Sequence, residues 1–113
     1  MNNPIADRIS DFLKNHHPFS KIQYAELFLV ANHIKVIYLE KNDILFKIND
    51  TIHNFFYVVA NGAIGLSVTS DTDEVLIDKC DEGDILGLRP FFAKDNYLMT
   101  AKAREESIVY AIP

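Results

Sequence analysis

The chain opens with apolar residues that recur at helical spacing. Four of them share one predicted helical face: Ile5, Ile9, Phe12 and Leu13. Asn3 and Pro4 are typical of an N-cap and a first helical position. Pro18 disfavours the helical conformation for the residue before it, so we expect this first helix to end near residues 15–18.

A second helix is expected directly after this break. Ser20 and Gln23 have the spacing of a capping box, and residues 22–31 supply an apolar face. Residues 1–32 are therefore predicted to form a helical lead-in.

The helical period disappears at His33 and gives way to short β-branched and aromatic runs separated by polar turns. Residues 33–113 are thus predicted to be all β. The expected strands are 34–39, 44–48, 55–60, 63–69, 75–80, 99–104 and 107–112.

Asn61-Gly62 is the strongest turn signal, because a two-residue type I′ hairpin needs positive φ at both positions. The strands on either side of it are expected to pair. After this turn, apolar residues alternate from Ile64 to Val68, which predicts one face in the core and the face of Gly65, Ser67 and Thr69 toward water.

Many short strands at regular spacing indicate a mainly β fold with N-terminal helices, an antiparallel β-roll or jelly-roll barrel (double-stranded β-helix). A sandwich is the alternative. At 113 residues and 49% hydrophobic content, one domain over 1–113 is expected. The longest apolar stretch, 27–31, is far shorter than a membrane-spanning helix, no secretory leader is evident, and Cys80 is the only cysteine, so we expect a cytoplasmic protein.

Residues 83–98 interrupt the strand pattern with a predicted short strand, a tight turn, one helical turn and a loop. Gly87 can adopt backbone angles closed to other residues, and Pro90 suits the first turn of a helix. A helix start there, with Arg89 beside it, is able to attract a small anion. The alternative is an ordinary strand-to-helix corner in which Phe91 and Phe92 pack into the core.

Three segments stand in order along the chain: Lys41-Asn42-Asp43-Ile44-Leu45-Phe46, Phe56-Tyr57-Val58-Val59-Ala60-Asn61-Gly62-Ala63-Ile64 and Glu82-Gly83-Asp84-Ile85-Leu86-Gly87. In this order they resemble segments of the cyclic nucleotide-binding domain family, the effector domain type of the catabolite activator protein. The last one resembles the opening of the family's phosphate-binding cassette. The resemblance covers nearly the whole chain and implies the β-roll fold.

The resemblance also implies where a ligand would bind, and two positions depart from the family. The family has Glu for the ribose hydroxyl where this chain has Leu88, and Arg for the cyclic phosphate near Tyr97 or Leu98. Because an unpaired polar group in a pocket is costly, cyclic AMP binding is expected to be weak or absent. Candidate ligand-binding residues are Gly87, Leu88, Arg89, Pro90, Phe91, Leu98, Met99 and Thr100. The expected ligand is a cyclic nucleotide or another small anion, with no cofactor.

A looser resemblance points to bacterial proteins in which such a domain precedes CBS modules and a predicted nucleotidyltransferase domain. In the family, two further helices follow the last strand, whereas the chain ends at Pro113. We therefore expect a fragment of a longer protein, with downstream domains as its partners.

The net charge of −5 is concentrated between Asp71 and Asp84, where seven carboxylates accompany Lys79 alone among cations. Nucleic-acid binding needs clustered Lys and Arg, so this segment predicts no nucleic-acid partner. A solvated turn region is favoured over a metal site.

The histidines give no support to a metal enzyme of the cupin type, which needs two histidines separated by one residue. His16 and His17 are adjacent, whereas His33 and His53 are isolated and are expected to be surface or cap residues. Cys80 lies in an apolar strand and is expected to be a small core residue. We predict no enzyme, no catalytic residue and no metal.

The function predicted from the sequence is regulatory: a roll that senses a small nucleotide-like ligand and controls domains that follow it. The alternative is a vestigial pocket filled by Leu88, Tyr97 and Leu98, with the roll acting as a docking or dimerisation module, for which a homodimer is left open. An open cassette interior would favour sensing, and an apolar filling would favour docking.

Overall fold

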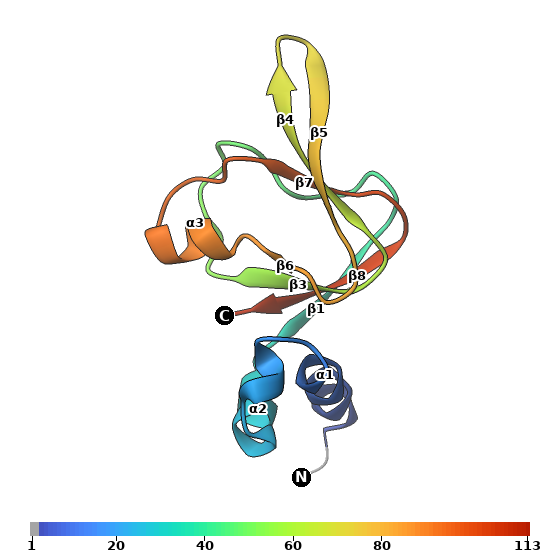
Figure 1. The fold of residues 1–113 in the computed structure, drawn as a ribbon, viewed down its shortest axis with the longest axis vertical. Coiled ribbons are helices and arrows are strands. Elements are labelled where there is room, and N and C mark those ends of the chain that lie inside the picture. The colour runs from blue at the N-terminus through green and yellow to red at the C-terminus, as the bar shows by residue number, and fades with distance from the viewer. Residues whose placement is uncertain (1–2) are drawn as a thin grey trace.

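The computed structural model describes residues 3–113 as two helices beneath a roll of two antiparallel sheets (Figure 1). The elements are α1 (Pro4–Lys14), a 3₁₀ turn (Phe19–Lys21), α2 (Tyr24–Ala31), β1 (Lys35–Leu39), β2 (Ile44–Phe46), β3 (Phe56–Asn61), β4 (Ile64–Ser70), β5 (Asp73–Cys80), β6 (Ile85–Leu86), α3 (Leu88–Ala93), β7 (Thr100–Ala103) and β8 (Ser107–Ile112). The predicted order of helices and strands is confirmed.

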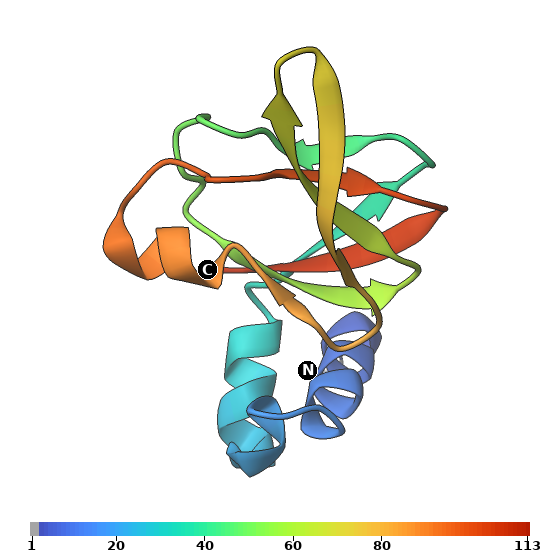
Figure 2. The same cartoon turned by 45° about the horizontal axis from the view of Figure 1, so that its top comes forward.

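The strands form two four-stranded sheets, one in the order β1-β8-β3-β6 and the other in the order β2-β7-β4-β5 (Figure 2). We call them the first and the second sheet. The expected β-roll is confirmed, although within residues 3–113 the strands make two separate sheets rather than one closed barrel. An apolar core that includes Val59, Ile64 and Val109 lies between the sheets.

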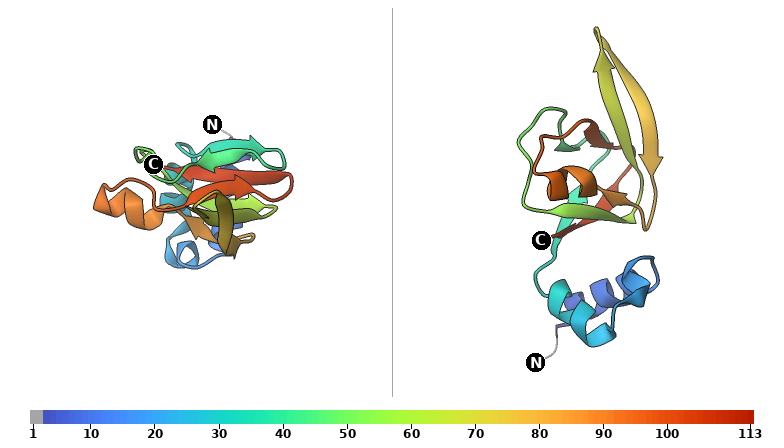
Figure 3. Two further views of the ribbon diagram at one scale, coloured as in Figure 1. Left: turned by 90° about the horizontal axis from the view of Figure 1, so that it is seen from above. Right: turned by 60° about the vertical axis from the view of Figure 1, so that its left-hand side comes forward.

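The helices cover the outer face of the first sheet, so this sheet is buried on both sides (Figure 3). Ile9, Leu13 and Leu27 pack there against Val58 and Ile112. The β4–β5 hairpin projects at the opposite end of the molecule, whose longest extent is 52 Å (Figures 1 and 3).

The first helix begins as predicted: Asn3 caps it by accepting a hydrogen bond from the Ala6 N–H at 3.1 Å, and Pro4 is its first residue. The predicted apolar face is correct except for Ile5, which is 61% exposed. Ala6 and Ser10 are buried beside Ile9 instead, because the face that meets the sheet is centred about a third of a turn away from Ile5.

The predicted capping box at Ser20 and Gln23 is wrong. Ser20 lies in the 3₁₀ turn, and Gln23 caps α2 without a side-chain hydrogen bond. Buried Phe19 holds the turn against the helical core, and the Lys14 ammonium group donates hydrogen bonds to the carbonyls of Ser20 and Ile22. These tertiary contacts fix the segment in place of the capping box.

The predicted Asn61-Gly62 hairpin is also wrong, because β3 and β4 lie in different sheets. Asn61 pairs with Ile108 of β8, and only Gly62 has positive φ, at 90°. A Cβ at Gly62 would overlap the Ser107 hydroxyl group, so the glycine allows a close crossing at a corner between the sheets.

The alternation predicted for β4 is correct for its apolar face only. Ile64 and Leu66 contact the core between the sheets, but Gly65 and Ser67 on the opposite face are buried as well. Side chains from β5 and from the end of β7 cover that outer face. The packing around Gly65 is correspondingly close, since a Cβ at this position would lie 3.0 Å from Leu76 Cδ1.

Candidate functional site

The cassette, residues 83–100, leaves the first sheet through β6 and returns to the second sheet through β7 (Figure 1). Gly87 adopts φ of 68° immediately before α3, and its carbonyl accepts a hydrogen bond from the Phe91 N–H at 3.2 Å. The helix was expected to begin near Arg89 or Pro90, and it begins at Leu88. It ends at Ala93, where Lys94 also adopts positive φ.

The structure distributes the eight predicted site residues over several environments. Gly87, Leu88, Pro90, Phe91, Met99 and Thr100 are half-buried, whereas Arg89 and Leu98 are exposed. Arg89, Pro90 and Leu98 share one small hollow together with Ala93, Asp95 and Asn96. Thr100 has a structural contact, since its hydroxyl oxygen accepts a hydrogen bond from the Ile48 N–H.

This hollow is about 50 Å³ in volume. Sites for small molecules commonly measure roughly 300–1,000 Å³. This hollow is therefore too small to enclose a nucleotide.

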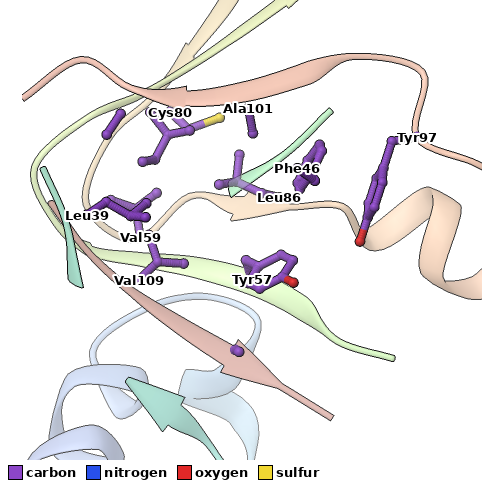
Figure 4. Packing of buried hydrophobic residues seen from close by; sticks show 12 residues of the cluster. Leu39, Phe46, Tyr57, Val59, Cys80, Leu86, Tyr97, Ala101 and Val109 are labelled. Atoms are coloured by element: carbon purple, nitrogen blue, oxygen red, sulfur yellow. The ribbon is translucent and has the colours of Figure 1, made fainter. Parts of the chain in front are cut away.

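The space behind the cassette is filled by Tyr97 (Figure 4). Tyr97 is completely buried, and its ring stacks on Phe46 with the ring centroids 3.9 Å apart. Gly87 lies against this stack, because a Cβ at that position would be 3.5 Å from Tyr97 and 3.6 Å from Phe46. One aromatic side chain thus closes the interior at the α3 end of the roll.

Leu88 and Leu98 do not fill the interior in the same way. Leu98 is 66% exposed and Leu88 is half-buried. Of the three residues expected to fill a vestigial pocket, only Tyr97 is buried in the core.

His53 belongs to the same region, which the sequence did not reveal. Its backbone N–H donates a hydrogen bond of 3.0 Å to the Tyr97 hydroxyl oxygen, and its ring Nδ1 is hydrogen-bonded to the Tyr57 hydroxyl group. The expectation of an isolated surface or cap histidine is therefore wrong for His53. Tyr97 is 44 residues away along the chain, so no local spacing could have indicated this contact.

Both tyrosine hydroxyl groups remain neutral at physiological pH. Burial raises the pKa of Tyr57 far above its ordinary value, and the neighbouring Tyr97 adds to the shift. Burial likewise raises the pKa of Tyr97. Tyr57 and Tyr97 consequently offer aromatic surface and neutral hydroxyl groups to the interior at this end of the roll.

The cations of the cassette lie on its outer side. Arg89 is exposed, and the Lys94 ammonium group lies 5.4 Å from the centroid of the Phe91 ring. Phe92 of the same helix is 72% exposed, so the alternative in which both phenylalanines pack into the core is not observed.

The remaining candidates for chemistry are structural in this fold. Cys80 is buried in the core as predicted, and burial raises its pKa to about 12, with Asp84 contributing next. His16 stacks on Phe12. Within residues 3–113, no three histidine, cysteine or acidic side chains are grouped as metal ligands, and no helix is long and apolar enough to cross a membrane.

The acidic run is solvated, as predicted. Asp71, Asp73 and Asp78 are exposed on the β4–β5 hairpin. Glu74 forms the single salt bridge found in the described part of the chain, with Lys102 at 3.0 Å.

Comparison with solved structures shows the same fold in regulatory proteins. The regulatory domain of Toxoplasma gondii protein kinase A with cyclic AMP matches with a TM-score of 0.84 at 15% identity, over 99% of this chain and 42% of that one. The regulatory subunit of a cyclic AMP-independent protein kinase A from Trypanosoma cruzi, bound to guanosine, matches with a TM-score of 0.85 at 13% identity, over 96% and 39%. This chain thus spans less than half the length of either kinase subunit.

A cyclic nucleotide-binding-like protein from Brucella abortus matches over 94% of this chain and 90% of its own length, with 25% identity and a TM-score of 0.79. No curated protein matches the chain. The family model described as "Cyclic nucleotide-binding domain" matches residues 36–113, which is more than half of the chain. Together with the two-sheet roll and the β6–α3 cassette, this match shows that the chain belongs to the cyclic nucleotide-binding domain family.

Proposed function

We propose that this chain is a regulatory domain in which Tyr97 occupies space that a nucleotide ligand would need, so that cyclic AMP binds weakly or not at all. The observation that carries the proposal is the complete burial of Tyr97 on Phe46. In a longer protein, the domain would control further domains, as the family's architecture implies. Its ligand would be a cyclic nucleotide or another small anion.

The polar groups of the cassette support weak binding. Leu88 offers no acceptor for a ribose hydroxyl group, and exposed Leu98 offers no charge for a phosphate. Each missing charge-assisted hydrogen bond costs roughly 1.5–3 kcal/mol. Arg89 and Lys94 are the cations left in the cassette, and Arg89 is the one that lines the small hollow.

The Trypanosoma cruzi subunit supports a ligand other than cyclic AMP. That subunit belongs to a cyclic AMP-independent kinase and is bound to guanosine. A roll of this shape is thus compatible with regulation by a molecule without the cyclic phosphate.

The second candidate function is a docking or dimerisation module, with a homodimer as the simplest assembly. Exposed Phe92 and Leu98 favour it, because both are apolar and both belong to the cassette. In this function the pocket is vestigial, and we assign no catalytic residue and no cofactor in either case.

The test is calorimetric titration with cyclic AMP, cyclic GMP and guanosine. For cyclic AMP we expect a Kd about two to four powers of ten weaker than micromolar, because both main polar contacts are missing. The double change Leu88→Glu with Leu98→Arg should tighten binding by about tenfold or more if the ligand can still enter. Adding Tyr97→Leu to this variant should tighten it further, since a smaller side chain leaves room beside Phe46.

Micromolar or tighter cyclic AMP binding that Arg89→Ala leaves unchanged would contradict the proposal. The docking candidate has its own measurement: sedimentation of the protein with Phe92→Ser and Leu98→Ser. A dimer that dissociates in this variant favours docking, and a monomer in both proteins excludes dimerisation through the cassette.

A further inference from the structure

A second hollow lies on the outer face of the second sheet, on the side that faces away from the core. It measures about 300 Å³. Ile64, Leu66 and Ala101 of this sheet contact the core, so alternate residues of β4 and β7 point outward. We call this hollow the outer groove; it is lined by Lys41, Asn42, Gly65, Ser67, Glu74, Leu76, Lys102, Ala103 and Arg104.

The outer groove concentrates positive charge on an acidic protein. Three of the 11 lysines and arginines line it, against one carboxylate, although the chain as a whole has 16 acidic residues. Lys102 pairs with both oxygens of Glu74, at 3.0 and 3.3 Å. Lys41 and Arg104 form no salt bridge within residues 3–113 and are exposed.

The floor of the outer groove is recessed because Gly65 has no side chain. A Cβ at this position would lie 3.0 Å from Leu76 Cδ1 and 3.3 Å from Arg104 Cδ. These distances are at or below the limit of ordinary contact, so a side chain at Gly65 would displace both neighbours. The glycine thereby lets the Arg104 side chain lie close over the sheet.

Ser67 adds a hydroxyl group to this floor. The residue is only 3% exposed, and it lines the outer groove together with Lys41 and Arg104. A serine hydroxyl group is able to donate a hydrogen bond to an oxygen atom of a bound ligand.

Backbone hydrogen bonds join the two segments that carry Lys41 and Arg104. The Asn42 N–H donates a hydrogen bond of 2.8 Å to the Ala103 carbonyl, and the Ala103 N–H donates one of 2.9 Å to the Asp43 carbonyl. The Arg104 N–H is bonded to the Ala63 carbonyl at 2.9 Å. The turn that carries Lys41 is thus tied to the end of β7 that carries Arg104.

We propose that the outer groove binds a small phosphate-bearing molecule, with Arg104 and Lys41 as its charged partners and Ser67 as a hydrogen-bond donor. The planar guanidinium group of arginine matches two oxygens of one phosphate, and a lysine ammonium group adds a point charge. This site lies outside the cassette and does not depend on how the cassette functions.

The experiment is a titration of the ¹⁵N-labelled protein with inorganic phosphate, followed by amide chemical shifts at an ionic strength held constant with sodium chloride. We expect saturable shifts at Asn42, Gly65 and Ser67, with a Kd of about 1–10 mM for this minimal probe. Lys41→Gln with Arg104→Gln should weaken binding by about tenfold or more. Lys21→Gln, an exposed charge in the helical part, is the matched control and should leave the Kd unchanged.

Further variants and a second anion distinguish a specific phosphate site from nonspecific attraction of anions. Gly65→Ala should weaken phosphate binding without removing any charge. Ser67→Ala should also weaken phosphate binding, and the dispersion of the amide signals should show that the fold is intact. Citrate, a carboxylate anion, should bind more weakly than phosphate. Shifts that rise linearly without saturation, equal binding of citrate, or a Kd unaffected by the double glutamine variant would each overturn the proposal.

Discussion

The cassette and the β4–β5 hairpin both project from the roll, and they are held to it by different means. The cassette has only a two-residue strand and a short helix, but Tyr97 inserts completely into the core. The hairpin has a ladder of seven paired positions, yet Val75, Leu76 and Ile77 of β5 are between 42% and 56% exposed. Only Cys80, at the base of β5, enters the core.

The cassette is thus held to the roll mainly by one side chain, whereas the hairpin is held together mainly by backbone hydrogen bonds. Replacing a single residue is expected to loosen the cassette, because the pairing of β6 with β3 covers only two positions and Tyr97 itself carries the backbone bonds to Asn49 and Asp50. The hairpin should tolerate replacements along most of β5, because its hydrogen-bonded ladder does not involve side chains.

The largest expected effect is that of Tyr97→Ala. Removing a buried aromatic ring should lower the free energy of unfolding by about 3–5 kcal/mol, measured by chemical denaturation. Tyr97→Phe is the matched control: it keeps the stack on Phe46 and loses the hydroxyl group, which accepts the bond from the His53 N–H and lies beside the Tyr57 hydroxyl group, at a cost of about 1 kcal/mol. A loss below 1 kcal/mol for Tyr97→Ala would show that other contacts anchor the cassette.

A smaller effect is expected at the base of the hairpin when the pH rises. Burial raises the pKa of Cys80 to about 12, so above about pH 9 the unfolded thiol ionises while the folded thiol stays neutral. The unfolded state then binds fewer protons, and the free energy of unfolding should fall as pH rises from 9 toward 12. We compare the free energy of unfolding at pH 8 and at pH 10.5 for the parent protein and for Cys80→Ala. The decrease between these pH values should be about 1–2 kcal/mol larger in the parent protein.

The comparison of Cys80→Ala with the parent isolates the thiol, because Tyr57 and Tyr97 are present in both proteins. Equal losses of stability in the two proteins would mean that the base of β5 is open to water. The boundary between hairpin and core would then lie farther along the chain, near β6.

The smallest effect is expected for Ile77→Ser on the exposed part of β5. This residue is 56% exposed and lies at a register shift in the ladder, so the free energy of unfolding should change by no more than about 0.5 kcal/mol. The same change at buried Ile64 of β4 should cost several times more. A loss above 1 kcal/mol at Ile77 would show that another molecule covers the hairpin in solution.

Local patterns predicted the strands well because each strand carries its own alternation of side chains. Residues 107–112 were predicted with the observed bounds, and the strand predicted at 75–80 begins only two residues earlier. The strand-turn-helix order of the cassette also followed from local signals, above all Gly87 and Pro90.

The errors concern contacts between distant residues. Asn61-Gly62 carries a hairpin signal, but β3 pairs with β8 and β6, and a dipeptide contains no information about strands that far along the chain. Tyr97 was recognised as a departure from the family's arginine, whereas its stack on Phe46 and its bond to His53 depend on the folded roll. The outer groove was missed for the same reason, since its cations come from separate turns and strands.

The two residues of β6 connect the two cores of the molecule. Leu86 contacts the core between the sheets, where Tyr97 also lies, and Ile85 packs on the other side against the helical core. Adjacent side chains of a strand point to opposite faces, so this short strand places one side chain in each core. We expect a displacement that pulls Leu86 out of its packing to shift Ile85 against the helical core as well, because one peptide unit joins the two residues.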